Sequence, residues 1–462
     1  ADPSDAVSYK VELRNPDGTL ETDFTPAPKD LNGYFTGRVK DATLANLDFT
    51  LTRNGAYDVV LTVKGGTQVV TDTRRILLNS ELKVGNFTFS QQDLVIPVSG
   101  IPLTVIRTYD SLKKGSGDFG NSWSYAIHDI DLKIDEKRQQ TLDSHNNLFS
   151  LRTGGGRNVT VTMPDSGRRV TFRYELEQSG WFSMIPVWLP PPGVYASLTS
   201  KVATKYMIQP FGGIQYWQDA GEDTPADNYD FSGFILTLKD GTKYEVERED
   251  LGEHVFQNGF VHSYGAAKLK RVTQRTGDKI DIQTNRIDHL NAANERTKSV
   301  IFERDAAGRI VAIHDPNGQD ANGNPGPNPA MKYEYSASGN LIKVHQLKEV
   351  PEATVENPNP APVYLTTEFQ YNNASHPHLI TDIIDPRGIK PLISEYDENG
   401  RLVATVDAFG NRTRLVHDIA GRTETIFDRM ANPTVHIYDA RGNAIQRTNV
   451  MSHTVTRTYD DN

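Results

Sequence analysis

The chain has 462 residues, no cysteine and a formal net charge of −10 at pH 7. This length allows about three domains, and the acidic balance argues against nucleic acid as the main partner. Disulfides, thiolate metal sites and a cysteine nucleophile are excluded, no apolar run approaches the ~18 residues of a membrane span, and no signal peptide follows Ala1.

Short strand-like runs, separated by many of the 36 glycines and 25 prolines, fill the sequence, and helical periodicity is hard to find. The sequence therefore predicts an all-β protein. We expect an N-terminal β-sandwich over residues 1–82, a less regular β region over 83–299, and a long antiparallel β-ribbon over 300–462.

The first region alternates apolar and polar residues at Val7 to Leu13 and again at Tyr57 to Val63. The turn signals are Asn15-Pro16-Asp17-Gly18 and Arg53-Asn54-Gly55-Ala56. About seven short strands in ~75 residues are typical of an immunoglobulin- or fibronectin-type module. We expect a spacer or docking module, with carbohydrate or protein binding as the alternative.

The second region opens with an alternating strand around Val105 to Thr108, which follows an extended entry fixed by Pro102. Phe119 and Trp123 are predicted to be large apolar anchors. Farther on, the segment from Trp181 to Gly193 is rich in proline and aromatic residues, which predicts a packed loop rather than a central strand. Alternatively, an exposed recognition patch would use Trp181, Trp188, Tyr216 and Trp217 for stacking on a ligand.

The third region carries an internal repeat, in which Asp397, Asp418, Asp439 and Asp460 stand 21 residues apart. A fixed period of this size indicates one supersecondary unit repeated along the chain. A second turn signal halfway through each period, such as Asp407-Ala408-Phe409-Gly410, predicts two strands per repeat. The side chains alternate only weakly, so we expect a polar environment on both faces. The positions predicted to hold the repeat together are Tyr396, Asp397, Gly400, Arg401, Asp418, Gly421, Arg422, Tyr438, Asp439 and Gly442.

Two contacts between copies are expected. The tyrosine of one copy would lie beside that of the next, and the Arg or Asn after the glycine would pair with the neighbouring copy's aspartate.

The pattern Tyr-Asp-x-x-Gly-Arg, seen at Tyr396 to Arg401, resembles the YD repeat of the RHS/YD-repeat family. This family includes bacterial RHS toxins, the BC components of toxin complexes, and the teneurins. Residues 85–125, with Phe119 and Trp123, resemble the opening segment of RHS-type proteins. The resemblance implies a ribbon wound into a curved, hollow shell that can enclose a polypeptide. Neither the self-cleavage segment nor the toxin tail of such shells is found, so we expect a longer parent protein and an unpaired ribbon edge near residue 462.

No catalytic motif is present, and no cofactor or metal is predicted. The pair His376 and His378 and the loop Asp315 to Asn324 are explained at least as well by loop and turn chemistry as by metal binding. The sequence favours a secreted or cell-surface structural protein, not an enzyme, that encapsulates and helps deliver a C-terminal polypeptide toxin or effector of the same parent protein. The alternative is an adhesion protein that binds a cell-surface glycan or protein.

Overall fold

The computed structural model describes residues 7–14, 20, 33–37, 43–45, 47, 55–78, 84–113, 115–125, 132–134, 139–142, 148–151, 158–164, 169–178, 183–201, 204–208, 215–219, 232–256, 259–320, 323–355, 357–358, 360–439 and 442–459. The structure is 57% strand and 1% helix, which confirms the all-β prediction. Among the described residues no helix is long and apolar enough to cross a membrane.

One antiparallel sheet of 25 strands dominates the molecule. In spatial order its strands are β10 (Leu132–Ile134), β13 (Val159–Thr162), β14 (Arg169–Gln178), β15 (Ser183–Leu189), β16 (Ser197–Ser200), β17 (Thr204–Ile208), β18 (Gln215–Asp219), β19 (Gly233–Thr237), β20 (Lys243–Phe256), β21 (Gly259–Thr273), β22 (Lys279–Gln283), β23 (Arg286–Leu290), β24 (Arg296–Arg304), β25 (Ile310–His314), β26 (Met331–Tyr335), β27 (Leu341–Glu349), β28 (Val363–Gln370), β29 (Asp382–Ile384), β30 (Leu392–Tyr396), β31 (Leu402–Asp407), β32 (Arg412–Asp418), β33 (Thr423–Phe427), β34 (Pro433–Tyr438), β35 (Ala444–Thr448) and β36 (Thr454–Thr456). A 3-10 turn, η2 (Pro316–Gly318), follows β25.

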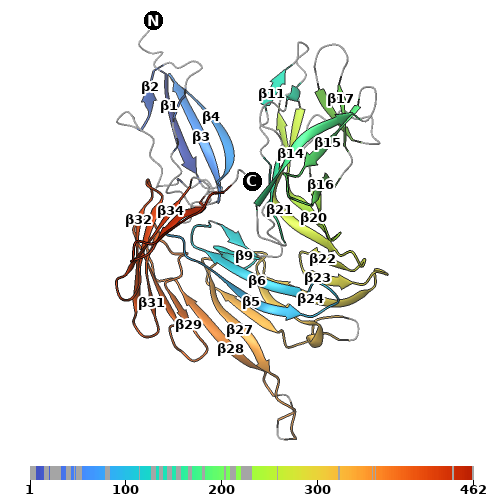
Figure 1. The fold of residues 1–462 in the computed structure, drawn as a ribbon, viewed down its shortest axis with the longest axis vertical. Coiled ribbons are helices and arrows are strands. Elements are labelled where there is room, and N and C mark those ends of the chain that lie inside the picture. Colours follow the sequence, from blue (N-terminus) through green and yellow to red (C-terminus); the bar gives the residue numbers. More distant parts are fainter. Residues whose placement is uncertain are drawn as a thin grey trace.

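From β19 onward each strand pairs with the next in sequence, so this part of the sheet is one continuous ribbon of hairpins. Figure 1 shows the ribbon curving from β20 and β22, past β27 and β28, to β32 and β34 on the opposite side. The prediction of two strands per repeat is confirmed, because β31 and β32 fall in one 21-residue period and β33 and β34 in the next.

A small sheet lies inside this curve (Figure 1). It consists of β5 (Thr88–Ile96), β6 (Leu103–Asp110) and β9 (Trp123–Tyr125), with the short hairpin β7 (Ser116–Gly117) and β8 (Gly120–Asn121) beside it. We call residues 84–125, which contain these strands, the strap.

The main hydrophobic core lies between the strap and the ribbon. Phe119, Trp123 and Tyr125 of the strap are buried against ribbon residues that run from Val246 in β20 to Leu402 in β31. The predicted role of Phe119 and Trp123 as apolar anchors agrees with this packing. The expectation of two polar ribbon faces is wrong for this stretch, because one face is covered by the strap. It holds better beyond β31, where β34 is only half-buried throughout.

The predicted loop from Trp181 to Gly193 is also wrong in its central part, which forms β15 within the large sheet. Pro186 pairs with Leu176 of β14 on one side. On the other side, the ladder pairs Ser183 and Met184 with β17 and Trp188 with β16, which leaves Pro186 in a gap between them. A proline lacks the N–H that a ladder needs, and the gap removes that requirement.

The N-terminal described residues form one antiparallel sheet in the order β2 (Phe35–Thr36), β1 (Val7–Arg14), β3 (Gly55–Gly65) and β4 (Gln68–Leu78). A second sheet facing it is not found among the described residues before the strap, so the immunoglobulin-like sandwich stays a prediction. The predicted turn residues Asn15 to Asp17 and Arg53-Asn54 lie outside the described residues. A separate hairpin of β11 (Gln139–Leu142) and β12 (Leu148–Leu151) lies beside the large sheet.

Candidate functional site: the strap on the repeat ribbon

The Asp-x-x-Gly turns owe their shape to the aspartate side chain. Asp397 Oδ1 accepts hydrogen bonds from the backbone N–H groups of Asn399 (2.9 Å) and Arg401 (2.8 Å). Gly400 adopts a φ of 73°, which favours glycine. Asp439 binds the Asn443 N–H in the same way (2.8 Å), and Gly442 has a φ of 75°.

The copy at Asp418 differs in detail. Asp418 Oδ1 accepts from the Gly421 N–H at 2.8 Å, and the positive φ falls one residue later, on Arg422 (50°). The Arg422 carbonyl oxygen then accepts from the Tyr438 N–H at 2.9 Å. The backbone hydrogen bond of this turn, from the Arg422 N–H to the Ile419 carbonyl oxygen (3.1 Å), therefore lies one residue later than in its neighbours.

In the turns at Asp305 and Asp439, the side chain of the residue after the glycine binds the aspartate of its own turn. Asn443 Nδ2 donates to Asp439 Oδ2 at 3.0 Å, and Arg309 donates to Asp305 at 2.8 Å through Nε. These contacts correct the expectation of a pair between neighbouring copies. The reason is local. The turn already places the residue four positions after the aspartate next to the aspartate side chain, so this contact requires no further ordering of the chain.

Connections between copies are made instead by the tyrosine hydroxyls. Four of them donate to a backbone carbonyl oxygen of the preceding hairpin: Tyr335 to Ile310 (2.5 Å), Tyr371 to Leu341 (2.8 Å), Tyr396 to Ile380 (2.9 Å) and Tyr459 to Ala444 (3.1 Å). Tyr438 donates to the Glu424 carboxylate instead. Burial raises the pKa of Tyr396 well above its usual range, so it stays a hydrogen-bond donor. His417 occupies the tyrosine position of its copy, and its Nε2 contacts the Leu402 carbonyl oxygen. The tyrosine position therefore holds successive hairpins together.

A buried ion pair lies at the centre of the strap. Arg107 Nε donates to Asp93 Oδ2 at 2.6 Å, and the two side chains are only 2% and 3% exposed. Tyr333 of the ribbon donates to the same oxygen at 2.7 Å. Burial disfavours the charged guanidinium, but the Asp93 carboxylate outweighs this and raises the pKa of Arg107. The guanidinium also lies 4.9 Å from the Trp123 ring centre, a cation–π distance.

Sequence reasoning missed this pair, although a signal was present. In β6 the inward-facing positions are Leu103, Val105, Arg107 and Tyr109, all buried. Arg107 therefore stands where the alternation demands an apolar residue, and a charge in that position indicates a buried partner.

The strap contacts the ribbon along much of its length. Near β24, Arg304 Nη1 donates to Asp118 Oδ1 at 2.6 Å. At the next hairpin the Asn121 N–H donates to the Gly339 carbonyl oxygen at 3.1 Å. Farther along, Tyr109 accepts a hydrogen bond from the Ile380 N–H at 3.1 Å.

The last contact is made by the leading end of the strap. Arg401 Nη1 donates to the Val84 carbonyl oxygen at 2.8 Å, and the Leu402 N–H donates to the Gly85 carbonyl oxygen at 2.8 Å. The Gly85 N–H donates to Glu424 Oε1 at 3.0 Å. Arg401, predicted to pair with the aspartate of a neighbouring copy, therefore binds a segment more than 300 positions away.

Metal binding receives no support within the described residues, where no group of three His, Asp or Glu side chains could hold an ion. His376 Nε2 contacts the Glu398 carbonyl oxygen at 2.8 Å, and His378 Nδ1 contacts Asn340 Oδ1 at 2.7 Å. In the loop after β25, Asp315 caps the Gly318 N–H and Asp320 binds Asn324. The two histidines and the loop after β25 therefore stabilise turns and contacts between segments of the chain.

Of the four aromatic residues considered for ligand stacking, Trp188 is the one whose side chain the structure describes. Trp188 is 4% exposed and packs at 5.2 Å, ring centre to ring centre, against Phe234, so the expectation that it is exposed is wrong. Trp181 and the side chains of Tyr216 and Trp217 lie outside the described part of the chain. The ladder places Tyr216 and Trp217 in β18, opposite β17.

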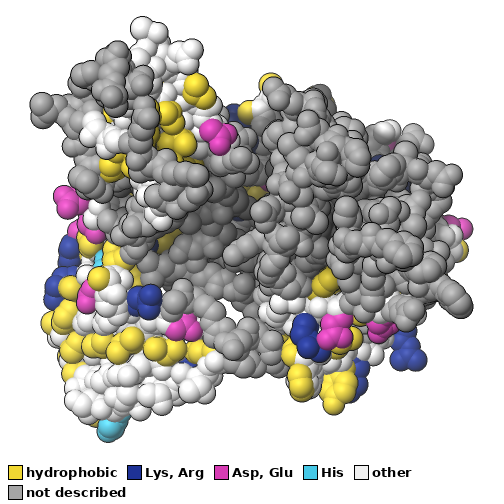
Figure 2. All heavy atoms as spheres, turned by 90° about the horizontal axis from the view of Figure 1, so that it is seen from above, with side chains coloured by type: hydrophobic (Ala, Val, Ile, Leu, Met, Phe, Trp, Pro, Cys, Tyr) yellow, Lys and Arg dark blue, Asp and Glu magenta, His cyan; other side chains and the backbone are white. Residues whose placement is uncertain are grey.

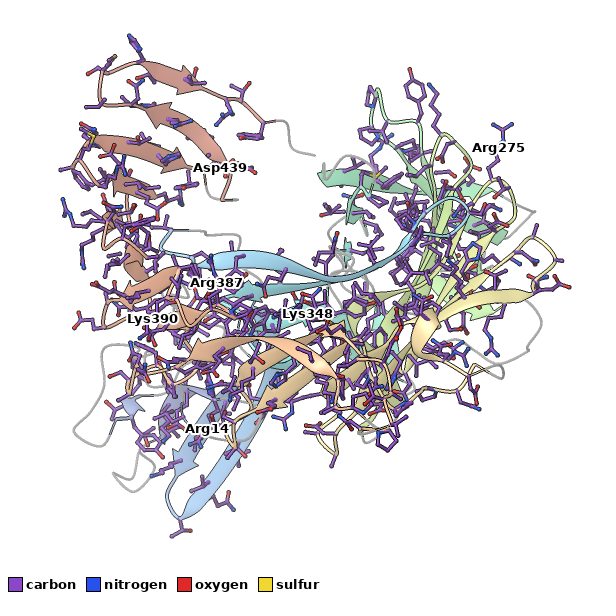
Figure 3. The ribbon with its side chains drawn as sticks, turned by 90° about the horizontal axis from the view of Figure 1, so that it is seen from below. Arg14, Arg275, Lys348, Arg387, Lys390 and Asp439 are labelled. Atoms are coloured by element: carbon purple, nitrogen blue, oxygen red, sulfur yellow. The ribbon has the colours of Figure 1, made fainter. Side chains whose placement is uncertain are left out.

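Exposed apolar side chains gather instead on the C-terminal ribbon. Phe409, Met430 and Met451 occupy the same position of three successive turns and are all exposed. Figure 2 shows a band of hydrophobic side chains at its lower left, where this ribbon lies. In Figure 3 Asp439 marks the same ribbon, apart from Arg387 and Lys390 in the turn between β29 and β30.

Comparison with known proteins supports the repeat assignment. Residues 396–426 match the family model described as RHS Repeat, and residues 81–172, which begin with the strap, match a domain of unknown function, DUF6531. No curated protein matches the chain.

Among solved structures, matches include "Crystal Structure of TcdB2-TccC3-TEV" (11% identity, TM-score 0.20, 85% of this chain and 24% of that chain) and "Structure of Photorhabdus luminescens Tc holotoxin pore, Mutation TccC3-D651A" (10% identity, TM-score 0.20, 87% and 24%). The chain spans about a quarter of the length of these proteins. Such distant matches add no argument to the one that the repeats supply. The family-model match therefore supports the assignment of an RHS repeat to residues 396–426.

Proposed function

We propose that this chain is a non-enzymatic wall segment of an RHS-type shell, which encloses and helps deliver a C-terminal polypeptide of the same parent protein. The observation that supports this most directly is the continuous curved ribbon with the strap on its inner side. The twist between strands accumulates along an open sheet of this length, and enclosure requires that the curvature of the sheet be fixed. The strap supplies that constraint, because it contacts hairpins from β24 to β33.

The side chains fit a structural role. The polar groups with defined partners at the strap, such as Asp93, Arg107 and Glu424, bind other groups of the chain itself. The separate roles of residues 1–82, 83–299 and 300–462 as docking module, shell opening and repeat ribbon are part of this proposal. So is a secreted or cell-surface location, in which enclosure would protect a polypeptide before delivery.

Protease protection of the parent protein tests enclosure. We expect a polypeptide encoded after residue 462 to survive a protease concentration that degrades the same polypeptide expressed alone. Trp123→Ala in the strap should remove this protection, because a buried Trp→Ala change costs roughly 3–5 kcal/mol and loosens the packing against the ribbon. Tyr195→Ala is the matched control, since Tyr195 is an exposed aromatic residue.

Two results would refute the proposal. One is a parent protein with no polypeptide after the repeats; the other is a downstream polypeptide cut equally fast with and without the shell.

A further inference from the structure

The leading end of the strap is held by three groups of the ribbon, and two of them are ionisable. His417 of β32 lies directly opposite Glu424 of β33 in the ladder, and Glu424 lies opposite His436 of β34. His417 and Glu424 side chains are 6% and 8% exposed. The Gly85 N–H donates to this same Glu424 carboxylate, so the strap is bound to a buried His–Glu pair.

The geometry around His417 fixes where its protons must be. Its Nε2 lies 2.5 Å from the Leu402 carbonyl oxygen, which can only accept, so Nε2 carries a hydrogen. Its Nδ1 lies 3.3 Å from Glu424 Oε1, an ion-pair distance. In the neutral ring, the lone pair of Nδ1 would therefore lie close to a carboxylate oxygen. Protonation of Nδ1 turns this repulsion into attraction.

We propose that this contact is a pH-dependent clasp, which holds Val84 and Gly85 on the ribbon while His417 is protonated and releases them as the pH rises. When His417 loses its proton, Glu424 keeps a buried negative charge without its cation, which is costly. The Gly85 N–H bond to that carboxylate then weakens with it.

Neighbouring charged groups support this direction. Burial disfavours the charged form of His417, but the Glu424 carboxylate and the Leu402 carbonyl oxygen outweigh it and raise the pKa of His417 above 6.5, with Asp397 acting in the same sense. Burial likewise opposes ionisation of Glu424, but His417 and the Gly85 N–H lower its pKa below 4.5.

The remaining neighbours come from β34 and from the turn before β31. Tyr438 donates to Glu424 Oε2 at 3.3 Å, and Arg401 binds the strap through the Val84 carbonyl oxygen. Burial lowers the pKa of His436; Glu424 acts in the opposite sense, but Arg447 and Arg457 lower the pKa further. His436 therefore loses its proton at a lower pH than His417.

The pH window follows from these signs. A raised histidine pKa contributes stability that is complete below pH 6.5 and is lost as the pH rises through the raised value. A lowered glutamate pKa contributes stability that is complete above pH 4.5 and is lost as the pH falls through the lowered value. The clasp is therefore tightest between pH 4.5 and pH 6.5 and opens toward alkaline pH.

Hydrogen–deuterium exchange of this chain, corrected for the intrinsic effect of pH, tests the clasp. We expect the protection of the Gly85 and Leu402 amides to fall at least about tenfold between pH 5.5 and 8.5, since one pKa unit of coupling is a factor of ten. The Ile310 amide, which donates to the Asp118 carbonyl oxygen at another point of the strap, is the internal control and should not change.

His417→Gln should abolish the pH response, because glutamine cannot titrate. His345→Gln is the matched control: His345 also contacts a glutamate, Glu334, on the ribbon and should leave the response intact. Constant Gly85 protection across this pH range, or a full response in His417→Gln, would overturn the proposal. Should His417→Gln not fold, the NMR titration of His417 in the native chain must share its midpoint with the loss of Gly85 protection; a different midpoint would equally overturn it. The test needs no enclosed polypeptide, so its outcome is separate from that of the enclosure experiment.

Discussion

At the scale of single residues, the repeat motif divides its work between two side chains. The aspartate shapes its own turn, whereas the tyrosine hydroxyl reaches back to the previous hairpin. The short spacing from Asp397 to Arg401 makes the first contact readable from sequence. The partner of a hydroxyl at the end of a long side chain is set by strand register, which sequence reasoning did not supply.

The tyrosine contact can be measured at Tyr335, whose hydroxyl donates to the Ile310 carbonyl oxygen. Tyr335→Phe should lower the free energy of unfolding by roughly 0.5–1.5 kcal/mol, the net worth of one such hydrogen bond. Denaturant titration gives this value. Tyr195→Phe, at an exposed tyrosine, should change it by less than about 0.5 kcal/mol. Equal effects of the two changes would contradict a connecting role for the hydroxyl.

At the scale of elements, the strap depends on close backbone approach. Gly120 in β8 has a φ of 84°, and a Cβ atom there would clash with the Gly339 carbonyl oxygen of the ribbon. Gly410 has nearly the same backbone, with a φ of 80°, but nothing within 4 Å. Substituting each of these two glycines therefore separates the energetic cost of backbone strain from the cost of losing the contact between the strap and the ribbon.

We expect Gly120→Ala to destabilise the protein more than Gly410→Ala. Both changes place alanine in the left-handed region at a cost of roughly 1–2 kcal/mol, and Gly120→Ala adds roughly 1–3 kcal/mol for forcing the strap away from the ribbon. Unfolding midpoints of the two variants in urea provide the comparison. If Gly410→Ala is equally or more destabilising, the close approach of Gly120 to Gly339 does not contribute to the free energy of unfolding.

At the scale of the whole molecule, turn carboxylates are spread along the ribbon. Asn411 lowers the pKa of Asp407 and Asn432 lowers that of Asp428, each by hydrogen bonds to the carboxylate. At Asp305, burial opposes ionisation, but Arg309 outweighs it and again lowers the pKa. All of these aspartates start from an ordinary value of 3.8.

A lowered carboxyl pKa contributes stability that is present above the unfolded value and is lost as the pH falls through the folded value. We therefore expect the melting temperature, followed by far-UV circular dichroism, to fall below about pH 4. Asp407→Asn combined with Asp428→Asn should make the fall smaller, because asparagine does not titrate. A melting temperature that is the same at pH 2.5 and pH 5.5 would refute this account.

The sequence by itself determined the parts that depend on neighbours along the chain. Period, turn chemistry and β-rich composition predict the all-β class, the hairpins from β31 to β35 and the turn role of Asp397, because each rests on contacts within a few residues. The size of their aromatic side chains likewise predicted Phe119 and Trp123 as apolar anchors.

Tertiary structure alone decided what these elements pack against. The strap contacts Arg401 and Glu424 across more than 300 residues, and it turned one ribbon face into a core. It also buried Arg107 with Asp93, while the large sheet left the ladder gap that accommodates Pro186. No local pattern specifies such partners, because the chain must first close long loops before these contacts can form.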